Sequence, residues 1–277
     1  MGFRINTNVA SISAQRALTN TNKAAADNLS KMSSGSRIVK ASDDAAGLAI
    51  SEKLKSNVRS LNQANRNAND GISMIQVAEG GLNETQSILT RLRELSIQSS
   101  SDTVGDSERA FSDLEYQQLK SEMQRISEVT EFNGAKLLNG EGDKLEFQIG
   151  INNNDFQDRI SYDRQMTSSG LESLGVDSLT VSNKDGAQTS LASIDSAIEK
   201  VSGQRAALGA IQNRLSSTSN NLQVTSENLS AANSRIRDVD YAEATAMNAK
   251  MNILNSAGTS VLAQANTQGQ NALKLIG

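Results

Sequence analysis

Four residue types are missing from this 277-residue chain: proline, cysteine, tryptophan and histidine. Proline interrupts helix interiors because it has no N–H donor and its ring clashes with the preceding turn. A chain of this length without proline is therefore suited to long, unbroken helices. The absence of cysteine excludes disulfides and thiol chemistry, and the absence of histidine removes the commonest general base and metal ligand.

Aromatic residues are scarce at 3 %, and hydrophobic residues make up 37 % of the chain. This is little apolar surface for a compact globular core, but it suffices for helices that bury narrow stripes and leave their other faces wet. The net charge of -4 argues against a nucleic-acid partner. The sequence has no apolar run long enough for a membrane helix and no signal peptide at its start, so we expect no membrane partner.

A seven-residue repeat of apolar residues is the clearest pattern in the chain. A helix with this repeat supercoils with a partner helix. Two such helices are predicted, over about residues 49–99 and 191–237, and their similar lengths favour pairing with each other. The repeat positions are Leu54, Leu61, Ala68, Ile75, Leu82 and Leu89 in the first helix, and Ile194, Val201, Leu208, Leu215, Leu222, Leu229 and Ile236 in the second.

A third helix is predicted over about residues 107–130, with its N-cap at Asp106 or Ser107. Two turn dipeptides follow it, Asn133-Gly134 and Asn139-Gly140. Inside the first long helix, the pair Gly80-Gly81 should cost about 1 kcal/mol per glycine relative to alanine. Close packing against a neighbour or a local bend would each explain this pair, and the sequence leaves both open.

A small β region is predicted at about residues 142–186, where the apolar period changes from helical spacing to two. Leu145, Phe147 and Ile149 alternate with polar residues, which is typical of a half-buried strand. Its hairpin partner should lie around residues 160–162. Leu179 and Val181, ahead of a polar turn, predict one more short strand.

Both ends of the chain carry apolar stripes in segments otherwise rich in Asn, Ala, Ser, Thr and Gln. Such segments alone bury too little apolar surface to offset the loss of backbone entropy. We therefore expect about residues 1–42 and 238–277 to be disordered in the isolated chain and helical once many copies meet. The candidate polymerisation residues are Ile5, Val9, Ile12, Met251, Leu254, Val261 and Leu275.

No catalytic, cofactor-binding or metal site is expected. The chain has no Gly-rich phosphate loop and no nucleophile elbow. Asp43 and Asp44 are neighbours that cannot face each other on a helix, and they suit the start of the first long helix, where carboxylates complement the dipole. Residues 152–155 read NNND, which lacks the spacing of a calcium loop and predicts a turn.

Nine segments carry a resemblance to a known family. The N-terminal half contains RINTNV at residues 4–9, SSGSRI and DDAAGLAIS within residues 29–54, RLRELSIQS at 91–99 and FNGAKLLNG at 132–140. The C-terminal half contains SLASIDSAIEKV from residue 190, LGAIQNRL from 208, SRIRDVDYA from 234 and AGTSVLAQAN from 257. In this order the segments resemble bacterial flagellin over roughly residues 1–140 and 190–277.

This resemblance implies a mainly α fold with a long antiparallel coiled-coil rod. Residues 45–235 would form the rod domain, and residues 1–44 with 236–277 would form a second helical coiled-coil domain lining the inner tube of the filament. The chain would be an extracellular subunit exported by the flagellar type III apparatus. Its implied partners are other copies of itself in a helical homopolymer, an export chaperone, the filament cap and hook-associated proteins.

The middle of the chain departs from many flagellins because it leaves room only for the hairpins of the rod. The chain should therefore be a near-minimal form without large outer domains. The resemblance also implies recognition by the host Toll-like receptor that senses flagellin. The matching positions are Arg91 and Leu95, which share one helical face, and Glu122 on the third helix.

Three alternatives belong to other functional classes or roles. A hook–filament junction protein would share the terminal helices and the export route, but the segments AGTSVLAQAN and DDAAGLAIS favour flagellin. A helical signalling hairpin of the chemoreceptor type would need a membrane tether or a sensor domain. An enzyme is disfavoured, since the metalloprotease inserts of a few flagellins require histidine, which this chain lacks.

Overall fold

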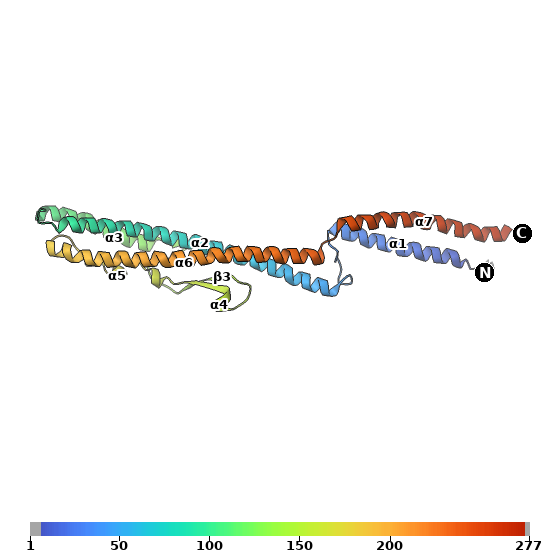
Figure 1. The fold of residues 1–277 in the computed structure, drawn as a ribbon, viewed down its shortest axis with the longest axis horizontal. Coiled ribbons are helices and arrows are strands. Elements are labelled where there is room, and N and C mark those ends of the chain that lie inside the picture. The colour runs from blue at the N-terminus through green and yellow to red at the C-terminus, as the bar shows by residue number, and fades with distance from the viewer. Residues whose placement is uncertain (1–6, 275–277) are drawn as a thin grey trace. The chain divides into compact units, whose positions relative to one another are not determined.

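The structure is a computed structural model that describes residues 7–274, without the side chains of residues 268–274. It is mainly α, as the sequence predicts (Figure 1). The long helices are α1 (Val9–Ser34), α2 (Ala45–Ser99), α3 (Asp106–Val129), α6 (Lys184–Arg237) and α7 (Tyr241–Lys274). The short elements are β1 (Glu131–Phe132), β2 (Ala135–Lys136), β3 (Leu145–Gln148), α4 (Asp155–Asp158), β4 (Arg159–Tyr162), the 3-10 helix η1 (Gln165–Thr167) and α5 (Leu171–Leu174).

The chain divides into two compact units. One consists of residues 1–56 and 228–277, and the other of residues 57–227. The long helices α2 and α6 each contribute residues to both units. The domain borders expected from the sequence, after residues 44 and 235, stay a proposal.

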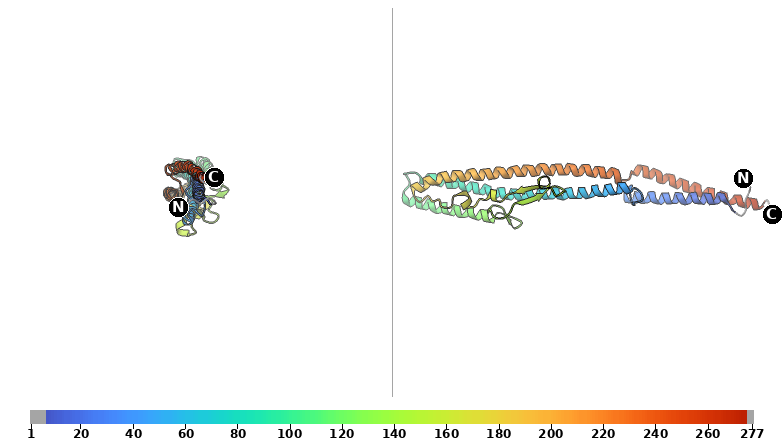
Figure 2. Two further views of the ribbon diagram at one scale, coloured as in Figure 1. Left: turned by 90° about the vertical axis from the view of Figure 1, so that its right-hand side faces the viewer. Right: turned by 90° about the horizontal axis from the view of Figure 1, so that it is seen from below.

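The unit that contains both chain ends is built on α1 and α7, which lie side by side (Figures 1 and 2). Asn8 Nδ2 donates to the Ala265 carbonyl at 2.8 Å near one end of the pair. Near the other end, the Tyr241 hydroxyl donates to the Met32 carbonyl at 2.8 Å. The helices therefore run antiparallel. Composition predicts disorder here in the single chain, whereas the structure has paired helices.

The other unit has the larger core, formed between α2, α3 and α6. The predicted repeat is confirmed, because Ala68, Ile75, Leu82 and Leu89 of α2 are buried and face a buried row on α6. That row consists of Ile194, Val201, Leu208 and Leu215. Side chains also join the two helices in antiparallel register: Ser219 Oγ donates to Asn65 Oδ1 at 2.6 Å, and Arg93 Nε donates to Asp195 at 2.7 Å.

Both long helices begin earlier than predicted, because side chains cap them. Asp44 Oδ1 accepts from the Gly47 N–H at 2.8 Å, so α2 begins at Ala45. Asn183 Oδ1 accepts from the Gly186 N–H at 2.6 Å, so α6 begins at Lys184. The third helix is capped at Gly105 rather than at Asp106 or Ser107, since the Glu108 carboxylate accepts from the Gly105 N–H at 2.9 Å.

Two antiparallel hairpins lie against the helices. β1 pairs with β2 around the Asn133-Gly134 turn, and β3 pairs with β4 with Phe147 opposite Ile160.

The prediction of a strand at Leu179 and Val181 is wrong, since neither residue lies in a strand. The Leu179 carbonyl there accepts from the Lys120 amine at 3.0 Å, and the Val181 N–H donates to Asp113 at 2.9 Å. Side chains of α3 thus take the backbone groups that a strand partner would need.

The two neighbouring glycines of α2 differ in their surroundings. A Cβ on Gly81 would lie 2.7 Å from Leu138 Cδ1 and 2.8 Å from Thr130 Oγ1, so close packing explains this glycine. A Cβ on Gly80 would meet nothing within 4 Å.

Among residues 7–274, no helix is long and apolar enough to cross a membrane.

Candidate functional site

The candidate polymerisation residues lie on α1 and α7, apart from two. Ile5 and Leu275 fall outside the described residues. On α1, Val9 is 64 % exposed and Ile12 is 48 % exposed. On α7, Leu254 is 45 % exposed and Val261 is 59 % exposed. These four apolar side chains are only partly covered within the α1–α7 pair.

The face of α1 that turns to α7 is made mainly of small and polar side chains, with Leu18 and Met32 as the two large apolar ones. It comprises the half-buried residues Asn8, Ser11, Ala14, Leu18, Thr21, Ala25, Asn28 and Met32, which follow steps of three and four. None of the residues of α1 is fully buried. The apolar stripe predicted for this helix therefore lies beside the pairing face rather than on it.

The facing row on α7 has the same character. It comprises Ala244, Asn248, Met251, Asn255, Gly258, Leu262 and Ala265. A Cβ on Gly258 would lie 3.2 Å from Leu18 Cδ1, so the glycine admits this leucine. The Asn255 side-chain oxygen is buried without a hydrogen bond. Met251 is half-buried within the pair, and so it differs from Leu254 and Val261, which are exposed.

The outer side of α7 also carries a shallow depression lined by Asn252, Ile253, Ser256, Ala257 and Ser260. Ile253 is 69 % exposed there. Ile253 is thus a single exposed aliphatic side chain among small and polar neighbours.

The candidate receptor residues lie on α2 and α3. Arg91 donates to Glu94 and to Glu115, both at 2.9 Å, and these carboxylates raise the pKa of its guanidinium, Glu94 most. Glu122 lies seven residues beyond Glu115 and so on the same face of α3. Its hydrogen bonds with Arg125 lower its pKa. Arg91 and Glu122 are therefore both half-exposed, and each already forms an ion pair within the chain.

The placement of Leu95 on that surface is wrong. Leu95 is only 2 % exposed and belongs to the core between α2 and its neighbours. It shares a face with Arg91 as the spacing predicts, but Leu92 and Leu95 both point inward, and the long Arg91 side chain reaches outward past them. Leu95 can support the surface but cannot contact a receptor directly.

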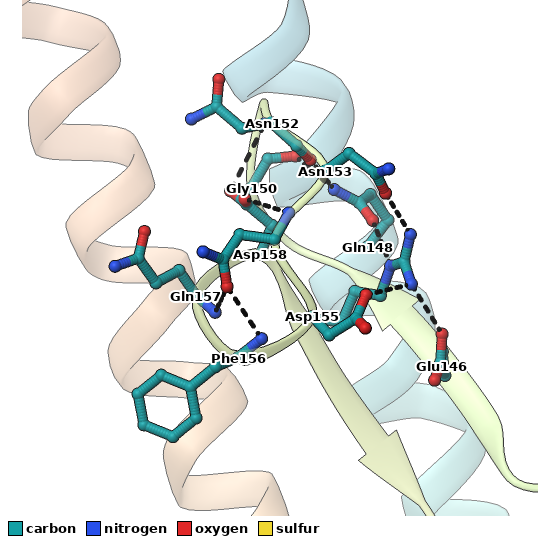
Figure 3. A network of polar contacts seen from close by, with 11 residues as sticks. Glu146, Gln148, Gly150, Asn152, Asn153, Asp155, Phe156, Gln157 and Asp158 are labelled. Carbon is teal, nitrogen blue, oxygen red and sulfur yellow. Dashed lines mark hydrogen bonds and ion pairs between the residues drawn. The ribbon is translucent and has the colours of Figure 1, made fainter.

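The β3–β4 hairpin ends in a polar network that the sequence analysis missed (Figure 3). The Arg159 guanidinium donates to Gln148 at 3.2 Å, to Asp155 at 2.6 Å, and also to Glu146 and Asn153. The Asp158 carboxylate is 5 % exposed and accepts from the Asn154 N–H at 3.0 Å. Four side chains therefore bind the guanidinium of Arg159. Their oxygens are already used as acceptors, whereas a metal site would need them free as ligands.

Phe156 projects from this network and is 84 % exposed (Figure 3). Asn154 Oδ1 accepts from the Phe156 N–H at 3.1 Å and so fixes the backbone beneath the ring. On α3, Phe111 and Leu114 are 72 % and 66 % exposed. In the sequence, a single aromatic residue in the polar run NNNDFQD was the feature that could have indicated an exposed Phe156.

Among the side chains that the structure describes, the basic residues Arg109 and Lys120 are buried, and the sequence did not distinguish them from solvated ones. Arg109 is 8 % exposed and Lys120 is 6 % exposed. Arg109 donates to the carbonyls of Ser99 and Ser101, both at 2.9 Å, and so closes the turn between α2 and α3. Lys120 donates to the Asp177 and Leu179 carbonyls, and burial lowers the pKa of its amine. Both residues serve the fold.

The acidic residues of the described part of the chain do not gather into a metal site. Residues 7–274 contain no group of three His, Cys, Asp or Glu side chains placed to hold a metal ion. Asp44 caps α2 through the Gly47 N–H, whereas Asp43 accepts from the N–H groups of Val39 and Lys40 in the turn before the helix, and these bonds lower its pKa. The acidic pair therefore lies at the start of α2, as predicted, but only Asp44 caps it.

Comparison with known proteins identifies the family. Residues 5–143 match the bacterial flagellin N-terminal helical region, and residues 191–276 match the bacterial flagellin C-terminal helical region. A flagellin of Halalkalibacterium halodurans is 43 % identical over 90 % of this chain and 90 % of its own length. The flagellar filament 33 kDa core protein of Treponema phagedenis is 42 % identical over 98 % of this chain and 99 % of its own.

Solved structures agree with this assignment. The crystal structure of Bacillus cereus flagellin has a TM-score of 0.51 and 28 % identity, over 61 % of this chain and 94 % of that one. A flagellar hook-associated protein from Vibrio parahaemolyticus has a TM-score of 0.59, over 71 % of this chain and 100 % of its own. Its 12 % identity shows a shared fold alone. Nothing here favours the junction-protein alternative, and this chain belongs to the bacterial flagellin family, as a structural subunit of the extracellular flagellar filament and not an enzyme.

Proposed function

We propose that the chain, once secreted by the flagellar export route, polymerises into the motility filament through the outward faces of α1 and α7. The observation that carries this proposal is the exposure of Val9, Ile12, Leu254 and Val261 within an otherwise paired unit. Neighbouring subunits would bury these side chains, and apolar burial stabilises by about 25 cal/mol per Å². Ile5 and Leu275, also proposed as polymerisation residues, lie outside the described residues.

The α1–α7 pair is well suited to being completed by assembly. Its pairing faces consist mainly of Ala, Ser, Thr and Asn, which bury little apolar area per residue. Isolated helices with so little tertiary support are marginal in water. We propose that the pair opens readily in the single subunit and becomes fixed when neighbours cover its outer faces, which would also suit export in an unfolded state.

Val261→Ser tests this surface, with Val224→Ser as its matched control. Both valines lie inside long helices, and they are 59 % and 57 % exposed. Loss of the apolar contact at Val261 should cost about 1 kcal/mol per subunit, a roughly fivefold rise in the critical concentration for salt-induced assembly. Val224→Ser should change this concentration little.

Equal effects of the two variants would contradict the proposed assignment of the surface. Far-UV circular dichroism should report a gain of helix as the wild-type chain assembles. Limited proteolysis of the subunit should remove both ends before it cleaves residues 57–227. A subunit whose ends resist protease as well as α2 and α6 do would contradict marginal pairing.

Further proposed partners follow from family membership: an export chaperone, the filament cap and hook-associated proteins. Recognition by the Toll-like receptor that senses flagellin is also proposed, with Arg91 and Glu122 as the contacting residues, since each is about half exposed. Arg91→Ala should weaken signalling by the purified subunit in cells that carry this receptor, while its circular dichroism stays unchanged. A subunit that never activates these cells would refute the proposal.

A further inference from the structure

The two Asn-Gly turns of this chain differ in a way that bears on chemical modification. Asn133 and Gly134 form the two-residue turn of the β1–β2 hairpin, with φ of 50° and 78°. These values match a type I′ turn, which requires positive φ at both residues. Both residues are exposed, and a Cβ on Gly134 would meet nothing within 4 Å.

The Asn133 turn is loosely held. The hairpin contains two residue pairs, Glu131 with Lys136 and Phe132 with Ala135, and beyond them the Leu137 N–H donates to the Thr130 carbonyl at 3.1 Å. Within residues 7–274, the Asn133 carboxamide makes no hydrogen bond, and the Gly134 N–H has no acceptor. Among these residues, no hydrogen bond therefore holds the Asn133 carboxamide away from the Gly134 nitrogen, and no neighbouring atom lies within 4 Å of an added Cβ on Gly134.

The Asn139 turn is held from several sides. The Asn139 side-chain oxygen accepts from the Glu141 N–H at 3.1 Å, and its amide donates to the Glu141 carboxylate at 3.1 Å. The preceding carbonyl, of buried Leu138, accepts from the Ser169 N–H at 2.9 Å. A Cβ on Gly140 would lie 2.6 Å from Ser168 Oγ, so this glycine is closely packed.

We infer that Asn133 is a site of spontaneous deamidation in this protein and that Asn139 is protected. The Gly134 backbone nitrogen attacks Cγ of Asn133, an N–C bond forms, the Cγ–Nδ2 bond breaks, and ammonia leaves with the proton of the Gly134 N–H. The product is a cyclic succinimide. Water then opens the ring at either carbonyl, giving aspartate or isoaspartate, with no change of oxidation state.

The product changes the hairpin physically. Aspartate places a negative charge at an exposed turn next to Glu131. Isoaspartate carries the chain through the side chain and lengthens the backbone in a turn that has room for only two residues. The site thus gives a secreted structural subunit a slow chemical modification at one defined hairpin.

The sequence allows both turns to be followed in one digest. Cleavage after Arg125, Lys136 and Lys144 yields residues 126–136 and 137–144. The first peptide contains Asn133 as its only amide side chain, and the second contains only Asn139. Any conversion of amide to acid is therefore assigned to its residue without ambiguity.

The experiment incubates the full chain at mildly alkaline pH, folded in buffer or unfolded in urea, and follows both peptides by mass spectrometry. Asn139 must first break its hydrogen bonds with Glu141, so Asn133 should convert at least about tenfold faster in the folded chain. In urea the two rates should converge, because glycine follows both asparagines. Glu141→Ala should accelerate only Asn139.

Isoaspartate in the 126–136 peptide, detected by an isoaspartyl methyltransferase, is expected from the succinimide step. Equal rates in the folded chain, or a rate ratio that urea leaves unchanged, would overturn the structural explanation. Conversion to aspartate alone, without isoaspartate, would overturn the cyclic intermediate. Asn133→Gln should abolish the conversion at this position, because glutamine forms the corresponding ring far more slowly.

Discussion

Alanine at Gly80 and at Gly81 should have opposite effects on stability, although the two positions are adjacent in α2. The exposed position Gly80 has no atom within 4 Å of an added Cβ. At Gly81 the added Cβ would lie 2.7 Å from Leu138 Cδ1 and 2.8 Å from Thr130 Oγ1. The same chemical change therefore meets open solvent at one position and a packed wall at the other.

The magnitudes follow from two competing effects. Alanine in place of glycine inside a helix stabilises by about 0.8–1 kcal/mol. Gly80→Ala should gain this amount. Gly81→Ala should gain the same but lose about 1–3 kcal/mol to overpacking. Leu138 is fully buried and Thr130 Oγ1 donates to the Ile126 carbonyl at 2.7 Å, so neither neighbour can move freely. The expected difference between the variants is about 2 kcal/mol.

Thermal unfolding of the full chain, followed by far-UV circular dichroism, measures this difference. For a unit of this size, about 2 kcal/mol corresponds to a separation of about 4–8 °C in Tm. Urea unfolding should give the same order with equal m-values. Two variants of equal stability would refute the reasoning, since Gly81 would then owe nothing to Leu138 and Thr130.

Three further outcomes are expected. Arg109→Ala should lower the free energy of unfolding by about 2–3 kcal/mol in urea titration, because the carbonyls of Ser99 and Ser101 lose a charged donor, and Arg109→Lys should restore only part of it. Burial raises the pKa of the Tyr162 phenol. Its contribution to the free energy of unfolding is therefore present below the ordinary phenol pKa of about 10 and is lost as pH rises through the folded pKa. In Tyr162→Phe the free energy of unfolding should fall less steeply with rising pH. A chelator should leave the unfolding midpoint unchanged, and a clear drop would reveal a metal that the sequence and the described residues do not suggest.

The coiled-coil part of the fold follows directly from the sequence, because a strict heptad repeat has one geometric consequence. Leu208 and Leu215 are fully buried at the positions where the repeat placed them. Register is harder to predict, since it depends on polar pairs such as Asn65 with Ser219 and Asn62 with Ser226. Those residues are too common in helices to stand out before their partners are known.

Two predictions, the strand at Leu179 and Val181 and the surface position of Leu95, were wrong. Both depend on tertiary contacts that local spacing does not reveal. Leu179 and Val181 have strand-like spacing, but Lys120 and Asp113 bind their backbone groups first. Leu95 lies four residues after exposed Arg91, so both are on one side of α2. Residues on one side of a helix can still differ in burial, because the neighbouring helix covers only part of that side. Periodicity predicts which residues share a face; it does not predict how far the neighbouring helix covers that face.

The two helix pairs of the chain differ in where they leave their apolar side chains. Between α2 and α6, leucine and isoleucine face inward and are fully buried, so this core needs no second copy. Between α1 and α7, the inward rows are mainly small or polar, with Leu18, Met32, Met251 and Leu262 as their large apolar residues, while Ile253, Leu254 and Val261 stay outside. Turning these residues inward would stabilise the single subunit by roughly 1.5–3 kcal/mol for each side chain. It would also remove the surface on which another subunit could gain stability, so a weak pair at the chain ends is the arrangement that favours the polymer over the subunit.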